Sequence, residues 1–364
     1  MRLEGIITNV KVGEPYFAKN LLVFPLVHEG GFANGNGQIM TLDEAFRKGL
    51  LSIHETGQID AAILDYKGEN PLFIIDGEAI YGALQDRVVN TAIWAHSSVK
   101  AHIPVSCVEQ GRWSGSHSFY ASNATVFPSL RAVLASSVTD SLRRTKMFET
   151  KRFKAERKER QQEPERPPET RPQRPSLDHF LFPQRGSSVA RAFASEQQLV
   201  WRQVRSSAMG LTVSSITQSV RDIFEAPQVK DKIQEYIDEI EIDENTVGLM
   251  AFLNDRLLAI DLFASSELLG KLKDKIVRGY AVDAMLAKGR TSKIDEKQAI
   301  ETLYAFGDVD FEEYDGAIDG TELRYKDKKF VARALLDDNG SFIHMSAFDL
   351  KATPEKPKFK KSLS

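Results

Sequence analysis

Short apolar or β-branched runs dominate the first 110 residues of the chain, with Gly, Asn and Asp between them. Short apolar or β-branched runs favour strands, and Gly, Asn and Asp favour the turns between strands. The pattern predicts strands at residues 5–12, 21–27, 61–66, 71–75, 87–94 and 99–108. The N-terminal part of the chain is therefore predicted to be rich in β-structure.

One helix is expected to interrupt these strands. Thr41 and Glu44 have the spacing of a capping box, with Thr41 as the N-cap. Gly49 follows and can end the helix with a left-handed turn. The spacing predicts a short helix between residues 41 and 49.

The pattern becomes helical from about residue 128, and the composition then changes abruptly. Apolar residues recur three and four positions apart at Leu130, Val133, Leu134, Val138 and Leu142. Residues 147–185 are rich in charge and proline, with little apolar content to bury, which is typical of a disordered linker. Nucleic acid is an unlikely partner except through the basic front half of this linker, where interleaved glutamates dilute the charge.

Helical and hairpin patterns return after the linker. They predict helices at residues 195–209, 214–224, 229–240 and 266–286, a hairpin of 247–252 with 257–263, and an antiparallel meander over 311–348. We therefore predict an α+β fold. Its expected parts are a β-rich first part (1–146), the linker (147–185), a helical and hairpin second part of the same domain (186–290), a small C-terminal α/β appendage (291–350) and a tail (351–364).

The composition allows a large core, and it gives no support for a nucleic-acid-binding, membrane-spanning or disulfide-bonded protein. The 364 residues are 42% hydrophobic and carry a formal net charge of −3, so the global charge favours neither nucleic acid nor anionic membranes. We find no secretory signal, and no segment approaches the roughly 18 uninterrupted apolar residues of a membrane span. Cys107 is the single cysteine and cannot form an internal disulfide. We expect a cytoplasmic protein without a membrane partner.

Charged and polar side chains are densest between residues 76 and 113. Cys107 lies where a predicted apolar strand ends and a glycine-containing turn begins, a place where protein scaffolds often present reactive groups. It could act as a nucleophile if Arg87 or Arg112 lowered its pKa, because the thiolate is the reactive species. The alternative is a small buried hydrophobe, the usual state of a free cysteine on an apolar strand.

Two glutamates of the same region are candidate acid–base groups. Glu78 and Glu109 could exchange protons with a substrate, while the arginines bind phosphate. A salt-bridge network that only fixes turns is equally consistent with the sequence. The candidate catalytic residues are Glu78, Cys107 and Glu109, and the candidate ligand-binding residues are Gln85, Arg87, Asn90, Arg112 and Trp113.

A metal site is not expected, and the sequence assigns no cofactor. His96 and His102 lie six positions apart with turn-like residues between them, and no histidine pair has the spacing of a helical metal site.

Two strings of this region resemble a known domain family. They are Gly82-Ala83-Leu84-Gln85-Asp86-Arg87, with Asn90 shortly after it, and Ile103-Pro104-Val105-Ser106-Cys107-Val108-Glu109-Gln110-Gly111-Arg112-Trp113. Over residues 3–286, apart from the linker, the chain resembles the family associated with ADP-ribosylglycohydrolases and rhodanese-like phosphatases. Members often have Gln-Asn-Arg where this chain has Gln85-Asp86-Arg87, so a carboxylate replaces the amide at position 86.

The resemblance implies a genomic association with enzymes that process ADP-ribose or nucleotides. One hypothesis is an enzyme acting on a nucleotide or ADP-ribose-like substrate in a stress, repair or defence context. The other is a non-catalytic ligand-binding or scaffold protein of such a system, with a nucleotide-like small molecule or a protein as its partner. Convergence of the candidate side chains on a concave pocket favours the enzyme, whereas burial in saturated ion pairs favours the binding protein.

Overall fold

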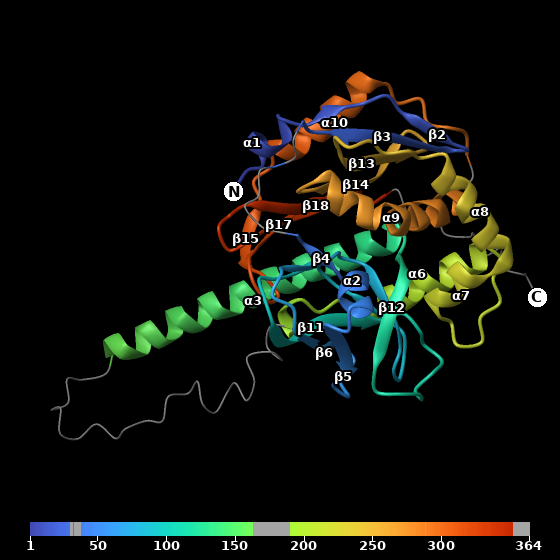
Figure 1. The fold of residues 1–364 in the computed structure, drawn as a ribbon. Helices are drawn as coiled ribbons and strands as arrows, with labels where there is room; N and C mark the ends of the chain where they lie inside the picture. Colours follow the sequence, from blue (N-terminus) through green and yellow to red (C-terminus); the bar gives the residue numbers. More distant parts are fainter. Residues whose placement is uncertain (30–31, 33–37, 163–189, 288, 352–364) are drawn as a thin grey trace, which may run out of the picture.

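The computed structural model describes residues 1–351 except 30–31, 33–37, 163–189 and 288, and for residues 152–162 it describes the backbone only. It confirms the α+β class. A large sheet forms one layer, a smaller closed sheet lies beside it, and helices pack between and around them (Figure 1). None of the helices in the described ranges is long and apolar enough to cross a membrane.

The large sheet has nine strands, and every pairing in it is antiparallel. Its order is β1-β3-β13-β14-β18-β17-β16-β15, with β2 paired to β3. The strands are β1 (Lys11–Val12), β2 (Tyr16–Ala18), β3 (Leu21–Val27), β13 (Thr246–Leu253), β14 (Arg256–Phe263), β15 (Glu312–Asp315), β16 (Thr321–Lys326), β17 (Phe330–Leu336) and β18 (Phe342–Asp349).

The smaller sheet has six strands in the order β12-β8-β9-β11-β6-β5. They are β5 (Leu51–Glu55), β6 (Ala61–Tyr66), β8 (Glu78–Gly82), β9 (Arg87–Val89), β11 (Val99–Cys107) and β12 (Phe119–Thr125). Its two edges meet at one end, because His54 bridges Ser118 and the Glu55 amide donates to the His117 carbonyl at 2.9 Å. We call this six-stranded element the closed sheet. A three-stranded sheet, β10-β7-β4, accompanies it, with β4 (Met40–Thr41), β7 (Leu72–Ile74) and β10 (Ile93–Ala95).

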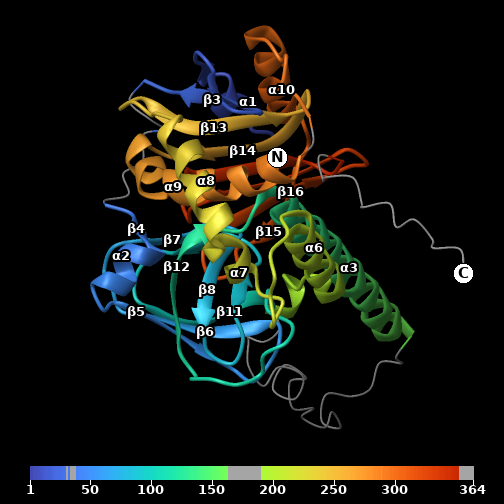
Figure 2. The ribbon, with the colours of Figure 1, turned by 90° about the vertical axis from the view of Figure 1, so that its right-hand side faces the viewer.

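Helices fill the space between the sheets and flank them (Figures 1 and 2). They are α1 (Glu4–Ile7), α2 (Leu42–Arg47), α3 (Pro128–Gln162), α6 (Gln197–Gly210), α7 (Val220–Glu225), α8 (Pro227–Asp238), α9 (Ser266–Leu286) and α10 (Glu296–Gly307). The expected helix at 266–286 is present with these bounds, and the Ser265 side chain accepts the Leu268 amide at its start.

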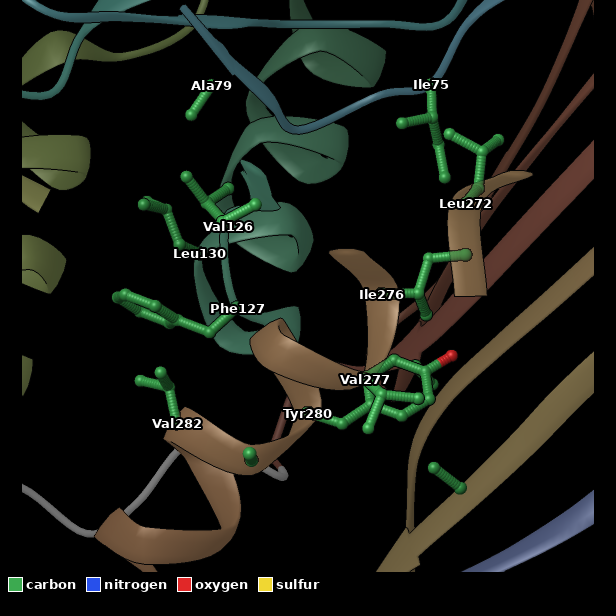
Figure 3. Packing of buried hydrophobic residues seen from close by; sticks show 14 of the residues in the cluster. Ile75, Ala79, Val126, Phe127, Leu130, Leu272, Ile276, Val277, Tyr280 and Val282 are labelled. Atoms are coloured by element: carbon green, nitrogen blue, oxygen red, sulfur yellow. The ribbon is translucent and has the colours of Figure 1, made fainter. Parts of the chain in front are cut away.

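The largest apolar cluster lies where α9 crosses the start of α3. Figure 3 shows Val282 of α9 beside Phe127, which precedes α3, and Leu272 and Ile276 of the same helix near Ile75. Members of this cluster come from both ends of the chain, from Ala18 to Phe348. Gly279 permits the close crossing, since a Cβ there would come within 3.1 Å of the Val126 carbonyl oxygen.

A buried network of charges joins the two sheets. Arg131 of α3 donates to both oxygens of Asp261 on β14, at 2.8 and 2.7 Å, and also to Asp76, which follows β7. Arg333 of β17 donates to Asp76 at 3.0 Å and to both oxygens of Glu322 on β16, at 2.8 and 2.7 Å. All five side chains are buried. Burial by itself would raise the pKa of Asp76, but Arg131 and Arg333 hold it well below its usual range.

The C-terminal strands continue the large sheet. Strand β18 pairs with β14 from Ile260↔Ala347 to Phe263↔His344, so the boundary expected near residue 290 lies inside one continuous sheet. Buried Arg333 and Glu322 also tie these strands to Asp76. The expected appendage, residues 291–350, shares its core and its buried charges with the rest of the chain.

Three local predictions differ from the structure. Residues 5–12 were expected as one strand, but Glu4–Ile7 form a helical turn and only Lys11–Val12 form a strand; Leu3, Ile7 and Val10, three and four positions apart, share one buried apolar cluster. Residues 87–94 form two strands, because the chain leaves the closed sheet at Asn90. Helix α7 begins only at Val220, where the Ser219 side chain caps it.

The start of the expected linker is helical. Helix α3 continues through Gln162, past residue 147. Residues 147–162 contain Lys, Arg, Glu and Gln, which favour helices, and the first proline comes only at Pro164. The rest of the linker, and the tail from residue 352, lie outside the described residues.

Replacing Asp76 by Asn should destabilise the protein by about 3–5 kcal/mol, because two buried arginines lose a shared carboxylate. Urea unfolding at neutral pH would measure this. The matched control is Asp310→Asn, which breaks the exposed pair with Arg2 and should leave the unfolding midpoint unchanged. Equal midpoints for wild type and Asp76→Asn would show that the network does not hold the sheets together.

Candidate functional site

The two polar segments singled out in the sequence meet at one end of the closed sheet. Strand β9 pairs with β11, which places Arg87 opposite Cys107. The preceding turn uses the left-handed region, with φ of +102° at Gly82 and +47° at Ala83. A Cβ at Gly82 would come within 2.9 Å of the Tyr120 ring, so glycine is required for this close approach.

The Asp86 carboxylate accepts hydrogen bonds from four groups at this end of the sheet. The Gly82 amide donates to its carboxylate at 2.8 Å, and the Ser219 hydroxyl at 3.0 Å. Arg112 and Arg221 also donate to it, at 3.2 and 2.6 Å. The Asp86 carboxylate is thus the shared anion of two arginines.

Arg112 uses all of its side-chain nitrogens on acceptors of the protein. Nε donates to both oxygens of Glu109 at 2.9 Å. Nη1 donates to the carbonyl oxygens of Ala83 and Ser114 at 2.8 Å, and Nη2 donates to Asp86 and to the Gly82 carbonyl. Arg112 therefore acts as a clamp that holds the turn and the loop after β11 together.

Glu109 is part of the same clamp, because its carboxylate accepts hydrogen bonds from Arg112. Burial would raise its pKa, but the bonds from Arg112 and from the Asp86 amide lower it. A carboxylate with a lowered pKa that already binds a guanidinium is a poor general base at neutral pH.

Cys107 is fully buried at the end of β11. Its thiol donates to the Gln85 side-chain oxygen at 3.1 Å and contacts Nη1 of Arg87. The backbone of Cys107 is held by Gln197, whose amide group pairs with its N–H and C=O at 2.9 and 2.7 Å. Burial raises the pKa of the thiol to about 11, and the nearby Arg87 only partly offsets this.

Arg87 is also fully buried, on the inner face of the closed sheet. Nη2 lies 3.3 and 3.4 Å from the two Glu55 oxygens, and Nη1 donates to the Ile59 carbonyl at 2.9 Å. The Trp113 ring covers the guanidinium, with its centroid 5.9 Å from Cζ. Nε has no hydrogen-bond partner among the described residues.

Two predicted site residues belong to other contacts. Glu78 is buried and contacts Lys275 of α9, which also pairs with Asp43 at 2.7 Å. Asn90 accepts the Ser106 hydroxyl at 2.6 Å and donates to the Phe193 carbonyl at 3.1 Å. Within the described residues, the polar contacts of Glu78 and Asn90 are thus separate from the Arg112 clamp, and each residue fixes a local junction of the chain.

Sequence reasoning missed Arg221 and Tyr120. The Arg221 guanidinium lies over the rings of Tyr81 and Tyr120, at 4.5 and 5.6 Å from their centroids. Arg221 is one-quarter exposed and Tyr120 half exposed. We call these two residues the arginine–tyrosine rim. No local pattern could have indicated it, because Arg221 is 135 positions from Asp86.

Metal ligands do not gather in the described ranges. No group of three or more His, Cys, Asp or Glu side chains there has an arrangement that could hold an ion.

Fold and site together define an α+β protein with a saturated carboxylate–arginine clamp and a partly exposed arginine–tyrosine rim beside it. The chain belongs to the family described as the ARG and Rhodanese-Phosphatase-superfamily-associated Protein domain, which matches residues 9–348. The match extends well past residue 286, where the resemblance was expected to end, and includes most of the C-terminal strands. Comparison with curated proteins gave no match, and neither did comparison with solved structures.

The Cys107 thiol should resist alkylation by iodoacetamide at pH 7 in the folded protein, because it is buried and mostly protonated. Addition of denaturant through the unfolding transition should release the full reactivity. Mass spectrometry measures this directly, since the chain has one cysteine. Rapid modification of the folded protein would instead identify an activated thiol.

Glu78 should make stability depend on pH. Burial and the neighbouring Asp43 raise its pKa to about 7 although Lys275 opposes this, so the folded state holds the proton more tightly than the unfolded state. The free energy of unfolding should therefore fall as the pH rises from about 4.5 to about 7, with a slope of up to roughly 1.4 kcal/mol per pH unit.

Glu78→Gln should flatten this part of the stability curve. The control is Glu267→Gln, which removes an exposed carboxylate paired with Lys271 on the same helix and should leave the slope as in wild type. Denaturant unfolding at several pH values would compare the three proteins. An unchanged slope in Glu78→Gln would contradict the assignment.

Proposed function

We propose that this chain is a non-catalytic binding protein for a nucleotide or ADP-ribose-like ligand. The observation that carries the proposal is the contrast between two arginines on one carboxylate. Arg112 donates from every side-chain nitrogen to acceptors of the protein. Arg221 instead donates to one side-chain acceptor, Asp86, and its Nε has no hydrogen-bond partner in the described part of the chain. The groups that an enzyme would need are engaged, and a partly exposed cation remains beside them.

Catalysis has little support from the candidate residues. Cys107 is buried with a raised pKa, and Glu109 is held by Arg112 with a lowered one. Glu78 is buried beside Lys275, and within the described residues its polar contacts are separate from those of Cys107 and Glu109. Nucleophilic or acid–base chemistry requires such groups to reach a substrate and each other, which these contacts do not favour.

The rim suits a ligand that combines a negative charge with a planar ring. A guanidinium binds phosphate oxygens with directed hydrogen bonds. Tyr120 offers the partly exposed face of a ring, on which a base or sugar can stack. The family's description and its implied company with ADP-ribose- or nucleotide-processing enzymes support the same ligand class, in a stress, repair or defence setting.

Calorimetric titration with ADP-ribose and with AMP tests the proposal. Arg221→Gln and Tyr120→Ala should each weaken binding by about tenfold or more, the effect of losing one charge-assisted hydrogen bond or one stacking contact. The matched control is Arg143→Gln, which removes a similarly exposed arginine that pairs with Glu312 outside this site. It should leave binding unchanged.

Two results would overturn the proposal. One is wild-type affinity in both rim variants, which would place the ligand elsewhere. The other is turnover of the bound ligand by the wild-type protein, measured by chromatography of the incubated ligand, which would identify an enzyme.

A further inference from the structure

The interior of the closed sheet ends in a pair of charges. Side chains alternate between the two faces of a strand, and the inward set includes Leu51, Ile53, Val89, Ile103 and Val105, which share one apolar cluster. Glu55 continues the series of Leu51 and Ile53 on β5, and Arg87 that of Val89 on β9. The Glu55–Arg87 pair therefore lies inside the sheet, at the end where β5 and β12 meet.

This pair leaves hydrogen-bonding capacity unused. Both Glu55 oxygens approach the same nitrogen, Nη2, and do so at the long distances of 3.3 and 3.4 Å. The Nε group of Arg87 has no partner in the described ranges, although the side chain is fully buried. An unpaired buried N–H costs free energy, so its presence beside a weakly engaged carboxylate indicates a place for a ligand.

Trp113 covers the pair from outside. Its ring lies against the Arg87 guanidinium, yet about half of the side chain is exposed, at 53%. It belongs to the stretch between β11 and β12, in which residues 113–118 are all exposed. A tryptophan on such a stretch can move aside and then stack on a ring that takes its place over the arginine.

We propose that this end of the closed sheet binds a purine base of the guanine type, with Trp113 as its stacking platform. The inference rests on the proposed function and deepens it, because the arginine–tyrosine rim then holds the phosphate of the same nucleotide. Guanine presents a carbonyl acceptor beside two N–H donors. The acceptor matches Nε of Arg87, and the two donors match the two oxygens of Glu55.

The surrounding residues support this division of roles. Arg112 joins the Gly82–Ala83 turn to the loop that carries Trp113, and it shares Asp86 with Arg221 of the rim. The base site and the rim are therefore connected through one carboxylate and one clamp. Glu55 and Arg87 would fix the identity of the base, whereas Arg221 would bind any phosphate.

Titrations with GMP, AMP and UMP test the base site on the full-length protein, followed by calorimetry and by tryptophan fluorescence. GMP should bind about tenfold or more tightly than AMP or UMP, because only its edge pairs with both oxygens of Glu55. It should also quench the emission of Trp113, and Trp113→Phe should remove that signal while Trp94 and Trp201 remain.

Two variants separate base recognition from general binding. Glu55→Gln should reduce the preference for GMP over AMP to within about twofold while AMP still binds. Its matched control is Glu312→Gln, which breaks the Glu312–Arg143 pair and should keep the preference. If Glu55→Gln fails to fold, Trp113→Ala on the exposed stretch should weaken GMP about tenfold or more and leave inorganic phosphate binding unchanged.

The outcomes distinguish the two proposals. Equal affinity for the three nucleotides, with Arg221→Gln still weakening all of them, overturns the base site and leaves the proposed function intact. No binding of any nucleotide overturns both. A GMP preference that survives Glu55→Gln, or Trp113→Ala where the former does not fold, also overturns the base site.

Discussion

The fold depends on the buried network of Asp76, Arg131, Asp261, Arg333 and Glu322. All three carboxylates and both arginines of this set lie in the interior. Each of them has a group of opposite charge within hydrogen-bond distance. Arg324 adds a third arginine through Glu322, at 2.7 Å. Buried charges are tolerated only when they are paired in this way, so the elements that carry them have to come together.

This requirement explains why the C-terminal strands are part of the main fold. Asp76 follows β7, beside the closed sheet, whereas Arg333 and Glu322 belong to the large sheet. Neither sheet could bury its share of the network alone without leaving unpaired charges. The single bidentate contact of Arg131 with Asp261 then fixes α3 against the large sheet, and Gly77 leaves room for that side chain, because a Cβ there would approach it within 2.6 Å.

Charge is used differently at the far end of the closed sheet. Clamp and rim share Asp86, but Arg112 satisfies all its nitrogens whereas Arg221 and Arg87 each keep Nε without a partner in the described residues. A saturated network stabilises a structure, whereas unpaired donors beside partly exposed aromatic rings suit a ligand. The distinction between the two kinds of arginine therefore underlies both proposals for this protein.

The sequence by itself determined the elements with strong local signals. Helix α9 and the β13–β14 hairpin follow from apolar spacing, and helix α2 follows from the Thr41–Glu44 capping box, because these features depend on residues a few positions apart. Short signals failed where the spacing was ambiguous, as over residues 5–12, which were predicted as one strand although Glu4–Ile7 form a helical turn and only Lys11–Val12 form a strand. The two polar strings of the sequence, residues 82–87 and 103–113, also marked the segments that carry Arg87, Cys107, Glu109 and Arg112.

Only the tertiary structure decided the protonation and hydrogen bonding of each of these groups, because both depend on partners that are distant in the sequence. Cys107 is buried and its pKa is raised. Arg112 is saturated through Glu109, Asp86 and three backbone carbonyls, and Arg221 reaches Asp86 across 135 residues of chain that no local pattern spans.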